Sequence, residues 1–264
     1  MNFFERKFSP LMYKAIRSQI KSFVSDMKAN GLTSAKSNLD RVIINTEVLS
    51  VVSKIYKTVG VYFANDTYRL ITEQVPQTKG FGFNQEWSDE IVNYFRLYLL
   101  NQATVPISQT TKDQIRAILI IGERNGWGVE EISRKLLSSE LTMMRAQLIV
   151  RTESGKAAFK GRELAKDKSP YELTSEWISA NDHRTRHSHR LIDGVIIPDG
   201  GKFSVPIYKR IGKADIQIGV DLMDGPGDPK ASKWNVINCR CTAAERVVFD
   251  SNDNVVMKRK IAIA

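Results

Sequence analysis

The spacing of apolar residues changes near Lys168-Ser169-Pro170, and this change constrains the fold more than any other feature of the chain. Before it, apolar side chains recur at steps of three and four residues, which is the period of an amphipathic helix. After it, short β-prone pieces at 174–179, 194–197 and 241–249 alternate with turns rich in Gly, Pro and Asp. The sequence therefore predicts an α+β protein, with an elongated helical N-terminal region followed by a small, loop-rich mixed α/β domain.

Helical segments are expected along most of the first part of the chain. An apolar stripe over residues 10–29 predicts one helix, which Asn30-Gly31 should stop, and a second stripe over 39–63 predicts another, bent at Gly60. A loop is expected at 76–83. Further helices are expected at 87–99, from Thr110 or Thr111 to a break at 125–128, through Ile132 and Leu136, and from Ser138 or Ser139 to Ala165.

These patterns divide the chain into a helical N-terminal domain (1–141), a compact C-terminal domain (142–250) and a basic tail (251–264). A content of 42% hydrophobic and 26% charged residues is ordinary for a folded protein, which excludes a chain that is disordered throughout. Apolar runs fall far short of the roughly 20 residues that cross a bilayer. The N-terminus lacks the pattern of a signal peptide, so we expect a cytoplasmic start and no membrane partner.

The chain is basic, with 39 Lys and Arg against 29 Asp and Glu and a formal net charge of +10. Such an excess favours polyanionic partners or acidic protein surfaces. The basic residues are spread along the chain, so they are also compatible with ordinary solvated helix faces. The sequence therefore assigns no nucleic-acid-binding residues.

All three histidines lie within residues 182–189, and both cysteines lie in Cys239-Arg240-Cys241. Alternate side chains of an extended segment share a face, so His187 with His189, and Cys239 with Cys241, can each present two ligands to one side. Imidazole and thiolate suit a structural zinc ion. Two alternatives are a pair of reduced thiols beside surface imidazoles and a strained disulfide within the Cys-x-Cys segment.

Arginines and aspartates surround the histidines, and they predict ion pairs that pin a loop. Arginine forks bind carboxylates or phosphates through two hydrogen bonds, so direct phosphate contact is the alternative. Arg151 and Glu153, two apart on one helix, should reach different partners. The loop set consists of Asp182, Arg184, Arg186, Arg190, Asp193 and Arg240.

Several of these residues, in this order and at this spacing, resemble the Mu F-like phage head morphogenesis family. The stretch 126–132 also resembles a segment that commonly precedes that domain. Each motif is short, but their joint order is specific. The matching residues are Arg151-Thr152-Glu153, Asp182-x-Arg184-Thr185-Arg186-x-x-His189, Asp193-Gly194, Phe203, Pro226-Gly227-Asp228-Pro229 and Asn238-Cys239-Arg240-Cys241.

The resemblance implies a non-enzymatic minor capsid protein of the virion, in the capsid interior or at the portal vertex, assembled in the host cytoplasm. Its implied partners are the portal protein, the major capsid protein and packaged double-stranded DNA. Only His189 of the three histidines falls on the family pattern. This narrows the zinc site to His189, Cys239 and Cys241, with Asp182 or His187 as fourth ligand. Residues before about Phe83 match nothing in this family.

Two other functions are compatible with the sequence. One is a metal-dependent nuclease or toxin that uses the His/Cys cluster, although a Gly-rich phosphate loop and the HExxH and GxSxG motifs are absent. Catalytic metal sites need an open coordination position, whereas two thiolates suit a closed structural zinc. The other is a scaffolding protein that leaves no trace in the mature particle.

Overall fold

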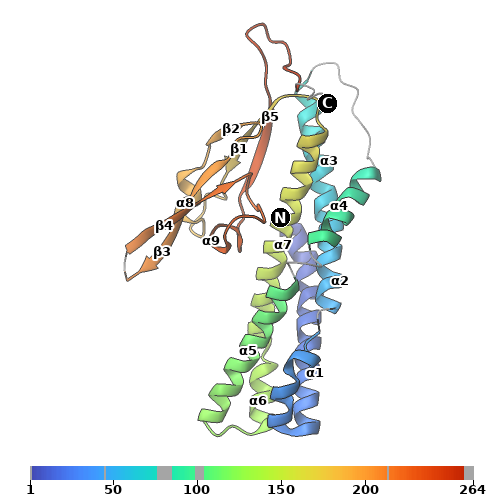
Figure 1. The fold of residues 1–264 in the computed structure, drawn as a ribbon, viewed down its shortest axis with the longest axis vertical. Coiled ribbons are helices and arrows are strands. Elements are labelled where there is room, and N and C mark those ends of the chain that lie inside the picture. The colour runs from blue at the N-terminus through green and yellow to red at the C-terminus, as the bar shows by residue number, and fades with distance from the viewer. Residues whose placement is uncertain (1, 45, 76–84, 99–103, 213, 259–264) are drawn as a thin grey trace, which may run out of the picture. The chain divides into compact units, whose positions relative to one another are not determined.

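The computed structural model describes residues 2–44, 46–75, 85–98, 104–212 and 214–258 (Figure 1). The chain forms two compact units, each made from two separate stretches. We call residues 1–55 with 92–150 the helical unit, and residues 56–91 with 151–264 the mixed unit. The domains predicted from the sequence, 1–141 and 142–250, are each one unbroken stretch of chain. Each unit of the structure instead combines two separate stretches. The loop expected at 76–83, and Arg259 and Lys260 of the basic tail, lie outside the described residues.

The helical unit begins with α1 (Asn2–Val42), followed by α2 (Thr46–Ile55). Asn30-Gly31 does interrupt α1, because Gly31 has φ 78° and ψ 166°, but the helix resumes and continues to Val42. The prediction of one helix over 39–63 is therefore wrong at its start, because residues 39–42 belong to α1. Leu39 and Ile43 are buried and continue the spacing of the buried Met27 and Ala35, which explains why the helix resumes after the break.

Later helices complete this unit, and most match the predicted segments. They are the end of α4 (Gln85–Tyr98), α5 (Thr104–Arg124), α6 (Val129–Leu136) and the start of α7 (Ser139–Lys168). Ion pairs join α1 to the later helices, with 2.8 Å between Lys28 Nζ and Glu130 Oε1 and between Lys112 Nζ and Asp40 Oδ1. No helix in the described part of the chain is long and apolar enough to span a membrane.

Two helical segments of the mixed unit contact each other through backbone atoms, with no side chain between them. The bend expected at Gly60 is a π-helix, η1 (Tyr56–Gly60), which leads into α3 (Val61–Glu73). Gly161 of α7 lies directly against η1, and a Cβ atom at this position would lie 2.2 Å from the carbonyl oxygen of Gly60. Only glycine therefore permits this approach of the two helices.

A three-stranded antiparallel sheet packs beside these helices in the order β2-β1-β5. Its strands are β1 (Leu173–Ile178), β2 (Ile196–Pro198) and β5 (Thr242–Val247), close to the three β-prone pieces, and Ser175 pairs with both Ile197 and Glu245. The side chain of Gln74, just after α3, donates to Glu245 O (3.0 Å) and accepts from Val247 N (2.9 Å). This amide ties the end of α3 to the outer edge of β5.

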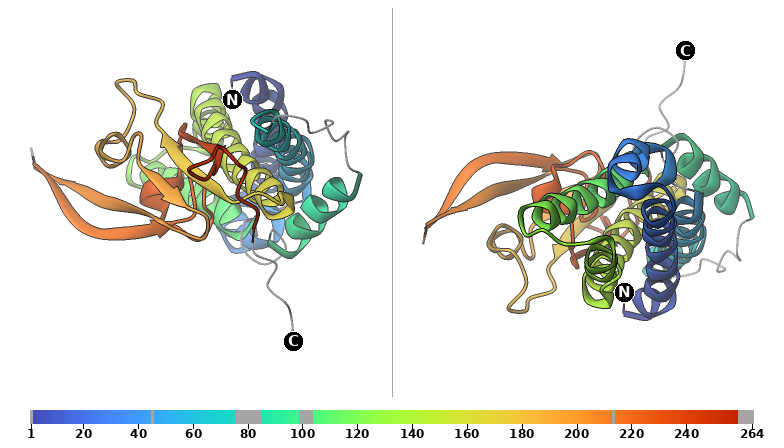
Figure 2. Two further views of the ribbon diagram at one scale, coloured as in Figure 1. Left: turned by 90° about the horizontal axis from the view of Figure 1, so that it is seen from above. Right: turned by 90° about the horizontal axis from the view of Figure 1, so that it is seen from below.

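A second sheet, which the sequence did not predict, is the hairpin of β3 (Phe203–Ile211) and β4 (Ala214–Met223). It extends from the mixed unit as a two-stranded ribbon (Figure 2). Its base enters the core, which also receives the short helices α8 (His187–Leu191) and α9 (Lys233–Val236). The buried core cluster consists of Trp177, Ile192, Ile197, Phe203, Val205, Met223 and Val236. Together these elements confirm the predicted α+β class.

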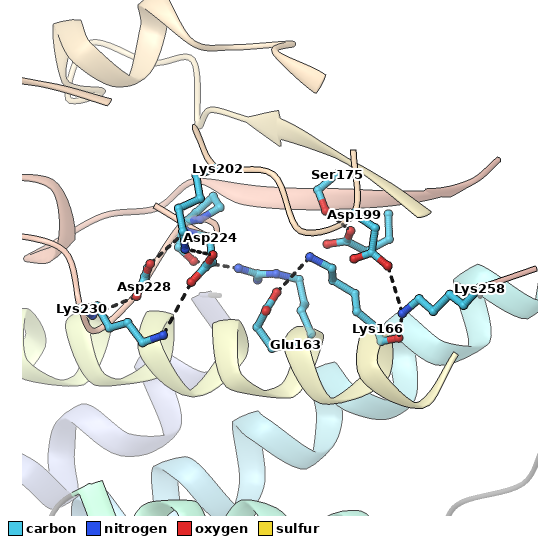
Figure 3. Close-up of polar contacts among 12 residues, drawn as sticks. Glu163, Lys166, Ser175, Asp199, Lys202, Asp224, Asp228, Lys230 and Lys258 are labelled. Carbon is cyan, nitrogen blue, oxygen red and sulfur yellow. Dashed lines mark hydrogen bonds and ion pairs between the residues drawn. The ribbon is translucent and has the colours of Figure 1, made fainter. Parts of the chain in front are cut away.

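Polar contacts hold the loops of the mixed unit against α7 (Figure 3). The buried Arg162 donates to the carbonyl of Pro226 (2.8 Å), and Lys258 donates to the carbonyl of Lys166 (2.8 Å) and pairs with Asp199 (3.1 Å). Burial lowers the pKa of Arg162, while the charges of nearby glutamates oppose this change. Since an arginine stays protonated under these conditions, its charge is available to hold the turn at 224–229.

The backbone contact at Gly161 can be tested with a matched pair of substitutions. Gly161→Ala should reduce the free energy of unfolding by more than about 2 kcal/mol, because the new methyl group would overlap backbone atoms that cannot turn aside. Gly155→Ala, on the same helix with nothing within 4 Å of its added Cβ, should be neutral or stabilising by up to about 1 kcal/mol. Urea denaturation measures both, and equal stability of the two variants would contradict the packing described here.

Candidate metal centre

The structure brings together His189 of α8 and the two cysteines that precede β5. Nδ1 of His189 lies 3.3 Å from Sγ of Cys241 and 3.6 Å from Sγ of Cys239. The three ligand atoms all lie within 4.8 Å of one another. His189 is 1% exposed and Cys239 is 7% exposed, so the cluster lies inside the mixed unit. This arrangement could hold a metal ion.

A hydrogen-bond chain fixes the orientation of the His189 ring. Nδ2 of Asn235 donates to Oδ2 of Asp221 (2.8 Å), which leaves the amide oxygen of Asn235 facing Nε2 of His189 (3.3 Å). An amide oxygen only accepts hydrogen bonds, so Nε2 carries the proton and the lone pair of Nδ1 points to the two sulfurs. The same Asp221 oxygen accepts from Oγ of Ser232 (2.7 Å). Such outer contacts are those that orient a histidine ligand.

The pKa values of the two free cysteines are shifted in opposite directions, and the hydrogen bond between them is the main cause. A hydrogen bond from Cys241 holds the pKa of Cys239 well below its usual range, against the opposing effect of burial. Hydrogen bonding to Cys239, together with burial, raises the pKa of Cys241. Cys239 is therefore the first of the pair to become a thiolate, which is the form that binds metal ions.

Arg240 lies between the two cysteines and pairs with Asp182. Its guanidinium makes two hydrogen bonds to the carboxylate, with 2.5 Å between Nη2 and Oδ1. Oδ1 also accepts from the backbone N–H of Arg184 (2.9 Å). Arg240 holds the pKa of Asp182 well below its usual range, with further lowering by the Arg184 N–H. Asp182 thus connects the histidine loop to the Cys-Arg-Cys segment.

Asn238 connects the Cys-Arg-Cys segment to α7. Its side-chain oxygen accepts from Nη1 of Arg151 (2.6 Å), and its backbone N–H donates to Oγ1 of Thr152 (3.0 Å). Asn238 has φ 61°, a left-handed conformation that asparagine tolerates better than most residues. Glu153 faces elsewhere, since it accepts from the hydroxyl of Tyr56 (3.2 Å). Arg151 and Glu153 therefore reach different partners.

The remaining predicted residues lie around the cluster without joining it. Asp193 accepts from the backbone N–H of Ser179 (2.7 Å), and Arg186 donates to the carbonyl of Ile237. The side chain of Arg184 is exposed. The ring of His187 lies against Tyr208, with 5.2 Å between centroids, and so the three clustered ligands do not include it.

Sequence reasoning missed Asn235 and Asp221, which orient His189. Neither residue belongs to a motif with ligand spacing, and they lie 14 residues apart, on α9 and β4. The unpredicted β3–β4 hairpin carries Asp221 to this position. The only available signal was the concentration of polar residues near the Cys-x-Cys segment, which does not by itself identify partners.

Comparison with known proteins places this chain among phage proteins. Residues 113–244 match the family described as "Phage Mu protein F like protein". The "Minor head protein GP7" of Bacillus phage SPP1 is 28% identical over 148 residues, which cover 55% of this chain and 40% of that protein. The chain therefore matches less than half the length of this relative. No solved structure matches the chain.

The Asp182–Arg240 pair predicts a pH-dependent loss of stability in Asp182→Asn. The folded-state pKa of Asp182 is depressed, so its stabilisation is complete above a pH of about 4 and is lost as the pH falls towards the folded-state value. The melting temperature of the metal-free variant should lie below that of the wild type at pH 7, and the gap should narrow below about pH 4.

Arg184→Ala, which removes an exposed neighbouring side chain, should leave the melting temperature unchanged at both pH values. Circular dichroism melts in the presence of a chelator measure the three proteins together. A gap that stays constant down to pH 2.5 would mean that the ion pair does not stabilise the fold.

Proposed function

This chain belongs to the phage Mu protein F-like family, and from this premise we propose that it is a minor head protein that joins the portal and the packaged DNA during head assembly. The observation that carries the proposal is the family match, which includes every residue of the candidate metal centre and the turn at 226–229. The similarity to a minor head protein supports the same role. Its place would be the virion, in the capsid interior or at the portal vertex.

Exposed apolar side chains of the helical unit support a protein partner, for which we propose the portal or the major capsid protein. Exposed apolar residues that gather on helices are typical of interaction surfaces. Ile120 and Ile121, adjacent on α5, are 48% and 47% exposed. Other exposed apolar residues of this unit include Phe3, Leu97 and Met144.

The net charge of +10 supports contact with double-stranded DNA. Lysine and arginine side chains that neutralise phosphates release bound counterions, so such contact weakens steeply as salt rises. This mode needs no base recognition, and it fits a protein that meets packaged DNA of any sequence.

Both proposed partners can be tested with the protein of residues 1–264 immobilised on a resin. Purified portal from the same phage should be retained at 300 mM salt, and a short DNA duplex should be retained at 50 mM and released at 300 mM. Ile120→Glu combined with Ile121→Glu should weaken portal binding about tenfold or more, because it places charges in an apolar contact.

Ile216→Glu on the exposed β3–β4 ribbon is the matched control and should leave portal binding unchanged. If portal passes through the column, the portal proposal fails. If DNA binds equally at both salt concentrations, or at neither, the electrostatic proposal fails.

The burial of the His189 cluster favours a structural role over the rival role of a metal-dependent nuclease or toxin. A catalytic metal must keep an open position that substrate can reach, whereas His189 and Cys239 are almost fully buried and Cys241 is half-buried. Membership of a family of phage head proteins supports the same conclusion. We therefore propose that the chain has no enzymatic activity.

The donor set fits zinc, and we propose zinc as the structural ion. A tetrahedral zinc with Zn–S of about 2.3 Å and Zn–N of about 2.0 Å places its nitrogen and sulfur ligands about 3.5 Å apart. The distances from Nδ1 of His189 to the two sulfurs, 3.3 and 3.6 Å, are close to this value. Such an ion would clip α8 to the Cys-Arg-Cys segment. The two candidates for a fourth ligand, Asp182 and His187, are not among the three clustered groups.

Zinc binding can be tested by metal analysis of the purified protein. We expect close to one zinc per chain, complete loss in Cys241→Ser, and a lower melting temperature after chelation, because structural zinc contributes directly to folding. His187→Ala removes a nearby imidazole outside the cluster and should keep its zinc. Protein without zinc, whose melting temperature is insensitive to chelation, would overturn the zinc proposal.

A further inference from the structure

The helical unit contains a cavity that neither the family match nor the metal centre explains. It has a volume of about 190 Å³ and lies between α1, α5, α6 and α7. Aliphatic side chains form most of its wall, including Ile16, Ile20, Ile115 and Leu136. The exposed Gln114 and Ala117 line it as well, so the cavity opens to solvent.

Among the residues that the structure describes, Arg145 is the only charged one that lines this cavity. Its Nη2 donates to the carbonyl of Ile107 (2.6 Å), while its buried Nε has no hydrogen-bond partner. Among the described residues, no carboxylate forms an ion pair with Arg145. The residues three and four positions away from it on α7 are not acidic. Burial lowers the pKa of Arg145 to about 10, so the side chain is still a cation at neutral pH.

Arg145 is half-buried and its Nε is fully buried, so the lack of a counterion is costly, because the cation loses hydration that no opposite charge replaces. An anion in the cavity would remove this cost and would satisfy the free Nε. The cavity therefore favours one negative charge beside Arg145, in a space that is otherwise mostly apolar.

The other polar groups of the cavity show which anion fits. The hydroxyl of Thr111 donates to the carbonyl of Ile107 (3.1 Å), and that of Thr142 donates to the carbonyl of Ser138 (3.3 Å). Each hydroxyl has only one proton to donate, and the amide of Gln114 is exposed and uncharged, so the guanidinium is the charged donor that remains. One guanidinium matches the two oxygens of one carboxylate, whereas a phosphate would keep excess charge and unsatisfied oxygens in an apolar space.

We propose that this cavity binds a carboxylate carried on a short aliphatic stem. The carboxylate would pair with Arg145, and the stem would lie against the isoleucines. A cavity of about 150 Å³ holds a benzene ring, so 190 Å³ accommodates about eight non-hydrogen atoms. A free short-chain acid and the side chain of a glutamate from another protein share this chemistry.

Titration calorimetry on the whole chain of residues 1–264 tests the site with hexanoate and the matched neutral probe 1-hexanol. Hexanoate should bind at least about tenfold more tightly, because a hydrogen-bonded charge pair is added to the same apolar contact. Arg145→Met should reduce this preference to less than about twofold while 1-hexanol still binds. Arg134→Met, which removes an exposed arginine on α6, should change neither affinity.

A second variant guards against misfolding of Arg145→Met. Ala117→Trp, at an exposed position on the cavity wall, should block both probes and leave the melting temperature within a few degrees of wild type. Equal affinity of hexanoate and 1-hexanol for the wild type would overturn the proposal. A preference for hexanoate that survives in Arg145→Met would overturn it as well.

The two sources of the carboxylate are separated with blocked tripeptides, acetyl-Leu-Glu-Leu-amide and its glutamine counterpart. Arg145-dependent preference for the glutamate peptide assigns the site to a protein side chain. Arg145-dependent binding of hexanoate without that preference assigns it to a free acid. If neither carboxylate probe is preferred over its neutral counterpart, the site does not bind carboxylates.

Discussion

The contact of glycine backbones with α7 determines where the loops of the mixed unit can lie. Gly161 allows η1 to approach the helix, and Gly227, with φ 89°, lies so close that a Cβ atom there would be 2.5 Å from the carbonyl of Gly155. Arg162 then holds the adjacent carbonyl of Pro226. Nearer the N-terminus of α7, Arg151 and Thr152 form hydrogen bonds with Asn238. The helix therefore positions both the 226–229 turn and the segment that carries the cysteines.

The helical part of the fold was largely predictable because burial on one face leaves a period that short windows of sequence reveal. The break at Gly31 was predicted, but its outcome was not, because glycine marks an interruption without showing whether the helix resumes. The β3–β4 hairpin was missed for a different reason. Much of this ribbon is exposed, so its alternating Ile216, Ile218 and Val220 do not mark a buried face.

The candidate site was predictable only as far as the residue types allowed. Clustering of histidines and cysteines indicated His189, Cys239 and Cys241, because thiolate and imidazole form a recognisable ligand set. The contacts of Asn235 and Asp221 depend on how a helix and a strand meet in space, and no local spacing encodes this. Similarly, the isolation of Arg145 is a property of everything that surrounds it, which a one-dimensional pattern does not contain.

The Cys-Arg-Cys segment makes contacts in two directions from three consecutive residues. Both sulfurs approach Nδ1 of His189, while the arginine between them pairs with Asp182. Inserting or deleting one residue here would exchange the two directions and place a guanidinium where a sulfur now meets the imidazole. We expect homologous chains to vary the amino acids around this segment more freely than its length, so that gaps in an alignment of the family would avoid it.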